Sequence, residues 1–221
     1  MELRADFSLR EFVSSLSEPW TASPMPGVER RMLDRVGGEV ARATSIVRYA
    51  PGSRFSSHVH DGGEEFLVLD GMFSDASGDF GSGCYVRNPP GSSHAPWSAD
   101  GAVIFVKLRQ FHPDDTTRVV IDSATAQWSP GEAEGSRVLA LHRFGSERVR
   151  LLRCSAGTRF DPKTHAGGAE MLVIDGAISD ERGRYRRGDW LRCPPGSTQT
   201  LASDEGCLVY LKTGHLPVVR A

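Results

Sequence analysis

FSSHVHDGGEEFLVLDGMFSD, at residues 55–75, returns as FDPKTHAGGAEMLVIDGAISD at residues 160–180. A second pair follows at the same spacing, GCYVRNPPGSSH at 83–94 and GDWLRCPPGSTQ at 188–199. Each pair is 105 residues apart, and no gap is needed between residues 49 and 108 of the first copy. Repetition over this length indicates two copies of one folding unit within the chain.

The repeat divides the chain near the polar segment at residues 112–115. We therefore expect one domain over residues 1–112 and a second over residues 113–221. Upstream of the ungapped region, Trp20 and Trp128 correspond at a spacing of 108. The second copy lacks three residues between Trp128 and Cys154, so the spacing is 105 from there on.

Short apolar runs separated by turn residues fill each copy. AVIFVKL at 102–108 and CLVYLK at 207–212 are rich in the β-branched and aromatic residues that strands favour, and 24 glycines and 13 prolines supply turns. The pattern predicts an all-β chain of closed sheets. One exception precedes the first copy, where Ser8-x-x-Glu11 resembles a capping box and predicts a short helix over residues 9–16 as an appendage to the fold.

Composition excludes several functional classes. The chain has 221 residues, and 26 Lys and Arg against 28 Asp and Glu leave a net charge of −2. A nucleic-acid surface needs a basic excess, so we expect no nucleic-acid partner. The sequence contains no run of about 18 apolar residues, so we expect no membrane span. The N-terminus lacks the apolar core of a secretion signal. Four cysteines without a C-x-x-C pair are expected to be reduced, in a cytoplasmic protein.

His58, His60, Glu64 and His94 are the most specific cluster of chemical groups. In a strand, His58 and His60 point to one face, and the turn residues before Glu64 and His94 can bring these two residues back to it. Three imidazoles and a carboxylate suit Zn, Fe, Mn, Ni or Co, and an octahedral ion would keep two open positions. The alternative is two exposed strand histidines and an unrelated loop histidine.

The surroundings of these residues resemble the two motifs of the cupin superfamily. The first is Gly52-x5-His58-x-His60-x3-Glu64-x6-Gly71, and the second is Gly83-x5-Pro89-x-Gly91-x2-His94, with Ser98 where the superfamily often has Asn. The resemblance covers each half and implies a bicupin, two tandem jelly-roll β-barrels. It implies that His58, His60, Glu64 and His94 bind one divalent transition metal per chain.

The second copy departs from the ligand pattern. At the spacing of 105, the four positions hold Lys163, His165, Ala169 and Gln199. Only the histidine remains, and a lysine ammonium repels a cation. We therefore expect a degenerate second barrel without a metal site.

Glu65 is a second candidate for the carboxylate ligand, because its counterpart Glu170 is retained in the second copy. Since Glu170 persists where the other ligands are lost, a structural role is expected for both residues, and Glu64 is assigned to the metal. Arginines retained in both copies could be the buried counter-charges, Arg54 with Arg159 or Arg87 with Arg192. The isolated His215 is expected to be a solvated surface residue.

Finer detail resembles the cupin domain of ChrR-type anti-sigma factors, in WTASPMPGVERRMLDR at 20–35, ARATSIVRYAPGSRFSSHVHDGGEEFLVLDG at 41–71 and YVRNPPGSSHAPWS at 85–98. That family senses singlet oxygen or related oxidants and coordinates zinc, which implies zinc here before iron, manganese or nickel. Its sigma factor is held by a separate helical domain. Residues 1–20 are too few for that domain and no H-x3-C-x2-C spacing occurs, so a sigma factor is not an expected partner.

Two functions remain open. The first is a sensor or regulatory protein whose metal site responds to an oxidant or a small ligand. The second resembles the cupin dioxygenases that cleave a small diketone or aromatic ketone, which leaves open whether the chain is an enzyme. Phe55, Phe66, Tyr85, Trp97 and Phe105 could line the pocket of such an enzyme. The paired barrels suit either a monomer or a homodimer.

Overall fold

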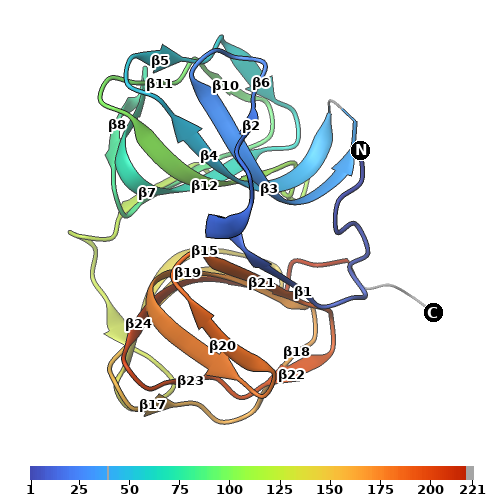
Figure 1. Cartoon of the computed structure of the whole chain (residues 1–221), viewed down its shortest axis with the longest axis vertical. Coiled ribbons are helices and arrows are strands. Elements are labelled where there is room, and N and C mark those ends of the chain that lie inside the picture. The colour runs from blue at the N-terminus through green and yellow to red at the C-terminus, as the bar shows by residue number, and fades with distance from the viewer. Residues whose placement is uncertain (39, 218–221) are drawn as a thin grey trace. The chain divides into compact units, whose positions relative to one another are not determined.

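The computed structural model describes residues 1–38 and 40–217, which contain strands, turns and a single 3-10 turn but no α-helix. Its contacts divide the chain into two compact units. Residues 1–5 and 18–126 form the first unit, and residues 6–17 and 127–221 form the second. Figure 1 shows the strands of each unit wrapped into a barrel. The prediction of an all-β chain with two tandem barrels is confirmed.

The first unit has a main sheet in the order β13-β9-β7-β12-β4-β3-β2, with β5, β8 and β11 paired at its side, and a separate ribbon of β10 and β6. Its strands are β2 (Thr21–Ala22), β3 (Val28–Gly37), β4 (Ala41–Tyr49), β5 (Ser53–Arg54), β6 (His58–His60), β7 (Glu64–Asp75), β8 (Gly78–Gly81), β9 (Cys84–Asn88), β10 (Ser92–His94), β11 (Trp97–Ser98), β12 (Ala102–Leu108) and β13 (Val119–Asp122).

The second unit repeats this order as β1-β21-β19-β24-β16-β15-β14, with a separate ribbon of β18 and β22. Its elements are β1 (Glu11–Ser14), the 3-10 turn η1 (Ser15–Ser17), β14 (Ser129–Pro130), β15 (Ser136–Phe144), β16 (Glu147–Cys154), β17 (Thr158–Arg159), β18 (Lys163–His165), β19 (Ala169–Asp180), β20 (Gly183–Arg186), β21 (Asp189–Cys193), β22 (Ser197–Gln199), β23 (Ala202–Ser203) and β24 (Cys207–Thr213).

Irregularities of the sheets also repeat. The pairing of β3 with β4 skips Leu33, and that of β15 with β16 skips Leu141, which is the equivalent position in the second copy. The pairing of β7 with β12 skips Leu69, and that of β19 with β24 skips its counterpart Ile174. Because a β-bulge bends its strand and increases the local twist, the two units bend at equivalent points.

A separate apolar core fills each barrel. Aromatic side chains dominate the first, where Tyr49 and Phe66 each contact Phe73 edge to face. The second core has smaller residues at the same positions, including Cys154, Met171 and Ile178. All five residues of β9 and all five of β21 are buried, so both faces of these central strands are covered.

The N-terminal segment differs from the prediction. Residues 11–14 form strand β1 rather than part of a helix, and only residues 15–17 make a 3-10 turn. β1 pairs antiparallel with β21 and buries Val13, which is 3% exposed, in the second unit. Phe12 beside it remains exposed, so buried and exposed side chains alternate as in a strand. The segment is therefore part of the sheet of the second unit and not an appendage.

β13 is the counterpart of β1 in the first unit. The two strands are related by the offset that also relates Trp20 to Trp128, and β13 pairs with β9 in the way that β1 pairs with β21. β13, which precedes the second barrel in the chain, therefore belongs to the sheet of the first barrel. β1, which precedes the first barrel in the chain, belongs to the sheet of the second.

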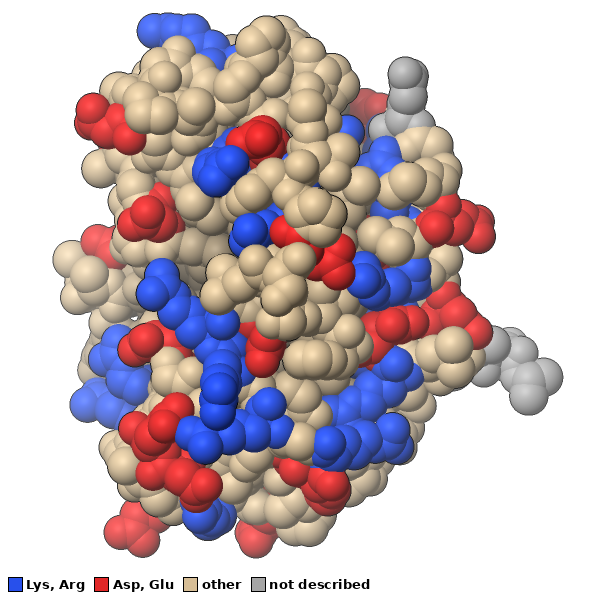
Figure 2. All heavy atoms as spheres, viewed as in Figure 1, with Lys and Arg blue, Asp and Glu red and all other residues tan. Residues whose placement is uncertain are grey.

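All four cysteines are buried free thiols. The described residues include no helix with the length and apolar character needed to cross a bilayer. On the face shown in Figure 2, acidic and basic side chains are interspersed, in keeping with the net charge of −2.

Candidate metal centre

A two-stranded ribbon brings the three predicted histidines together. β6 pairs antiparallel with β10, and His58 lies directly opposite His94. His60 shares the face of His58 because it is two residues further along the strand. The three ring centroids lie 4.7 to 5.0 Å apart, and one nitrogen from each ring lies within 4.8 Å of the other two.

Glu64 adds a carboxylate to this group. Its Oε2 lies 3.4 Å from His60 Nε2 and 3.5 Å from His94 Nε2. Asn88 Nδ2 donates a hydrogen bond of 3.1 Å to the same oxygen and thereby holds it in place. The turn before Glu64 depends on Gly63, which has a φ of +77° and leaves no room for a Cβ beside the Phe111 ring.

Two acceptors outside the cluster fix the orientation of the imidazoles. His58 Nδ1 donates to the Ser56 carbonyl oxygen at 2.8 Å, and His94 Nδ1 donates to Asp75 Oδ2 at 2.9 Å. When Nδ1 carries the proton, Nε2 of a neutral ring keeps its lone pair. Burial alone would raise the pKa of Asp75, but hydrogen bonds from Ser77 and His94 outweigh it and lower that pKa.

His60 gives the clearest test of whether these residues fit a metal ion. Its Nε2 is buried and makes no hydrogen bond within the described residues, although such an atom normally has a partner. Burial lowers the pKa of His60; Glu64 opposes this shift, while His94 and His58 add to it. A neutral imidazole with an unshared lone pair, facing two further imidazoles and a carboxylate, is the donor set that a divalent transition metal requires. These residues therefore constitute a candidate metal site.

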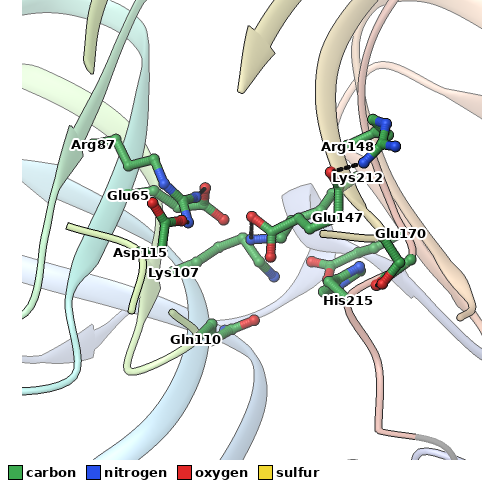
Figure 3. A network of polar contacts seen from close by, with 12 residues as sticks. Glu65, Arg87, Lys107, Gln110, Asp115, Glu147, Arg148, Glu170, Lys212 and His215 are labelled. Atoms are coloured by element: carbon green, nitrogen blue, oxygen red, sulfur yellow. Dashed lines mark hydrogen bonds and ion pairs between the residues drawn. The ribbon is translucent and has the colours of Figure 1, made fainter. Parts of the chain in front are cut away.

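Glu65 points away from this site. Its Oε2 accepts hydrogen bonds of 2.6 Å from Tyr85 Oη and from Arg87 Nη1, and Arg87 extends the pair to Asp115, also at 2.6 Å. Figure 3 shows this buried group around Arg87. Arg87 is the counter-charge of Glu65, whereas Arg54 lies over the Trp97 ring.

Glu170, the counterpart of Glu65, has different partners. It accepts from Trp190 Nε1 at 2.8 Å, and its Oε2 lies 3.0 Å from His215 Nε2. Figure 3 shows His215 beside Glu170. The side chain of His215 is 1% exposed, so the expectation of a solvated surface residue was wrong. Its position in the sequence, after the last strand, contained no sign of a buried partner 45 residues away.

The second barrel builds the same ribbon with other side chains. β18 pairs with β22 so that Lys163 lies opposite Gln199, and His165 is buried. Gln199 Nε2 donates to Asp180 at 2.9 Å, as His94 does to Asp75. Burial, Lys163 and Arg150 lower the pKa of His165.

A cavity of about 260 Å³ adjoins the histidines of the first barrel. Apolar side chains, including Val47, Ile104, Val106 and Leu108, form much of its wall, with Arg30, Arg35 and Arg109 among its polar residues. Of the five aromatic residues proposed from the sequence, only Phe55 lines this cavity. Phe66 lies in the core cluster, and Tyr85 is buried against Glu65.

Sequence reasoning missed the two side chains that orient candidate ligands, Asp75 for His94 and Asn88 for Glu64. Asp75 recurs as Asp180 at the spacing of 105. This repetition marks Asp75 as part of the shared fold but does not indicate that it accepts a hydrogen bond from His94. Asn88 has no such signal, because Cys193 replaces it in the second copy.

Solved structures with this fold include a proposed dioxygenase from Nostoc punctiforme, at 16% identity and a TM-score of 0.77, covering 93% of this chain and 82% of that one. A protein from Pseudomonas aeruginosa proposed to be glyoxylate-induced is 11% identical, with a TM-score of 0.76 and coverage of 96% and 91%. Protein YlbA from E. coli is 14% identical, with a TM-score of 0.71 and coverage of 97% and 95%. At these identities the similarity concerns the fold.

No curated protein matches the chain. The family described as ChrR Cupin-like domain matches it twice, over residues 9–112 and 116–217. The two matches together span most of the sequence and correspond to the two copies of the repeat. The chain therefore belongs to the ChrR cupin-like family, as a bicupin with two tandem domains of that type.

Proposed function

We propose that the first barrel binds one divalent transition metal through His58, His60, Glu64 and His94. The observation that carries this proposal is the buried Nε2 of His60, which has no hydrogen-bond partner among the described residues and lies 3.4 Å from the Glu64 carboxylate. In a protein without a metal function, such an atom would be a net cost in stability.

The ligand charges suit such an ion. Three neutral imidazoles and one carboxylate leave a net charge of about +1 on a divalent site, and octahedral geometry leaves two positions for exchangeable ligands. Zinc is our first assignment, and iron, manganese or nickel would use the same donors. When bound, the ion supplies a Lewis acid at the end of the cavity.

We assign the site to a sensor or regulatory protein that responds to an oxidant or a small ligand. The cavity of about 260 Å³ gives a small molecule access to the ligand side chains. Ser56 and Asp75 accept hydrogen bonds from the imidazoles of His58 and His94. Because β7 contains both Glu64 and Asp75, loss or exchange of a metal ligand would alter the contacts of this long strand.

A metal-dependent dioxygenase acting on a small diketone or aromatic ketone is the second candidate. It is favoured by the apolar wall beside the ligands, which suits a substrate with hydrocarbon groups. Tyr49 also lines the cavity, and burial together with Glu64 raises its pKa, so its hydroxyl stays protonated and can donate a hydrogen bond.

Elemental analysis of the full chain, purified anaerobically without added metal, tests both candidates. About one zinc per chain that is released by peroxide or singlet oxygen supports the sensor. About one iron per chain, with oxygen uptake when a diketone is added, supports the dioxygenase. A folded chain that neither contains nor takes up a transition metal contradicts the proposal, and close to two metals per chain contradicts a metal-free second barrel.

A further inference from the structure

The second barrel contains a larger cavity than the first. Its volume is about 480 Å³, compared with about 260 Å³ beside the candidate metal ligands. At three positions the core of the second barrel has small or flexible side chains where the first has aromatic rings. These pairs are Cys154 for Tyr49, Met171 for Phe66 and Ile178 for Phe73. The larger volume lies within the range of sites for small organic molecules.

Arg150 lies inside this barrel. It alternates along β16 with Leu152 and Cys154, both members of the core cluster, so its side chain shares their inward face. It lines the cavity together with Leu152. The register places Arg150 opposite Leu211, as Ser45 lies opposite Val106 in the first barrel. A guanidinium has therefore replaced a hydroxyl at an interior position.

The Arg150 guanidinium has no hydrogen-bond acceptor among the described residues. Its Nε is buried without a partner, and the carboxylate paired with it, on Glu132, is 3.7 Å from Nη1. Its side chain is only 21% exposed, although a guanidinium offers five N–H donors. A buried N–H group without an acceptor costs stability, so an acceptor supplied to it from outside the chain would be bound favourably.

Glu132 shows what kind of acceptor this is. Its carboxylate is at the mouth of the cavity, 60% exposed, and accepts from Lys163 Nζ at 2.6 Å. Lys163 and Arg150 thus form a pair of cations that already attracts a carboxylate of the chain, but at the rim instead of the interior. His165 and Gln199, both buried, also line the cavity.

The remaining wall is apolar and includes Leu152, Phe160, Leu201 and Leu211. An inorganic anion would make no use of this surface, whereas a carboxylate with a hydrocarbon part would contact both the cations and the apolar wall.

We propose that the second barrel binds a small organic acid, whose carboxylate is held by Arg150 and Lys163 in place of Glu132 and whose apolar part lies against Leu152, Leu201 and Leu211. This site requires no metal and is separate from the candidate metal centre.

Isothermal titration of the full chain with hexanoate, benzoate and succinate tests the proposal, with hexanamide and inorganic phosphate as comparison probes. We expect saturable binding of at least one carboxylate at one site per chain, with Kd of about 1 mM or tighter. Hexanamide and phosphate should bind at least about tenfold more weakly than that carboxylate, since the amide lacks the charge and phosphate lacks the apolar part.

Three variants locate the site. Arg150→Met should reduce carboxylate affinity by more than about tenfold and raise Tm of the unliganded chain by about 2 °C or more, because it removes a largely buried guanidinium whose Nε has no acceptor. Glu132→Gln should increase the affinity, because it removes the competing carboxylate. Arg159→Gln is the matched control, because Arg159 lines the rim but is paired with Asp204, and it should leave the affinity unchanged within about twofold.

Some results would overturn the proposal. These are no saturable binding of any of the three carboxylates, equal affinity for hexanamide or phosphate, or an Arg150→Met variant that is folded and binds as the wild type does. Metal content is a separate readout, since Arg150→Met should leave it unchanged. A chain without metal that binds carboxylate would contradict the proposed function but not this inference.

Discussion

The ribbons of the two barrels have the same backbone and present opposite chemistry. His58 lies opposite His94 in the first ribbon, and Lys163 lies opposite Gln199 in the second. In both, a carboxylate accepts a hydrogen bond at 2.9 Å from the side chain at the end of the ribbon. That side chain is an imidazole in one barrel and an amide in the other. The cavity of the first barrel is therefore lined by imidazoles at these positions, and that of the second by an ammonium and an amide.

The fold and the candidate site are therefore specified by separate residues. Bulges, turns and buried carboxylates recur in both barrels, whereas three of the four ligand positions have changed. The interior of the second barrel has also gained Arg150, where the first has Ser45. A scaffold that tolerates such exchanges can host different chemistries.

The strongest test of the asymmetry is the pair His60→Ala and His165→Ala. Because His60 is the proposed ligand whose buried Nε2 is without a partner in the described chain, we expect its alanine variant to retain less than about one tenth of the wild-type metal content. His165→Ala should retain all of it. Elemental analysis of both purified variants checks this, and equal loss of metal from both would contradict a site confined to the first barrel.

β1 and β13, the equivalent strands of the two units, provide the next test. Val13 in β1 and Ile121 in β13 occupy equivalent positions, since each is the third residue of its strand. Val13→Asp places a charge at a site that is 3% exposed, so it should cost about 3 kcal/mol. Ile121→Asp should cost less, because Ile121 is only partly buried.

Hydrogen exchange distinguishes the two effects. Val13→Asp should increase exchange in β21, the partner of β1, while β9 stays protected, and Ile121→Asp should do the reverse. Faster exchange in β9 after Val13→Asp would show that β1 does not belong to the second unit alone.

Asp75→Asn tests the contribution of the carboxylate that accepts from His94. It keeps an acceptor next to His94 but removes the charge, so metal affinity should fall by about 10- to 100-fold without loss of the fold. Asp180→Asn, its matched control behind Gln199, should leave metal affinity unchanged. Competition with a chromophoric chelator measures both, and an Asp75 variant with wild-type affinity would contradict the orienting role.

The smallest expected effect is a pH dependence of stability. Burial, followed by Lys163 and Arg150, lowers the pKa of His165 from 6.5. Below about pH 6.5 the unfolded chain takes up a proton that the folded chain does not, so the free energy of unfolding decreases as the pH falls toward the folded pKa. His165→Gln should flatten this decline. Thermal melts between about pH 7.5 and pH 5 check it, and a constant difference in Tm between the two proteins would contradict it.

Much of the first barrel could be predicted because the chain supplies its own internal comparison. The repeat separates residues that maintain the fold, such as Glu65 and Glu170, from Glu64, which changes together with the other ligands. The hydrogen bonds of Glu65 to Tyr85 and Arg87 show the physical basis of that distinction.

Features that depend on distant partners could not be predicted. β1 has four residues, too few to distinguish a strand from a helical turn by periodicity, and its partner Arg192 lies in the last part of the chain. Arg150 was overlooked because it lies outside the ligand motifs. Its position between apolar residues in VRLLRC, at 149–154, was the only sign of an arginine on an inward face.

The pairing of β1 with β21 has a consequence for synthesis of the protein. Residues 11–14 leave the ribosome long before residues 189–192, with which they pair. At typical rates of translation, this interval is roughly 10 to 40 s. During that time Phe12, Val13 and Leu16 have no sheet to join, and an unpaired apolar segment invites misassembly. β1 can thus take its place only after β21 has been synthesised.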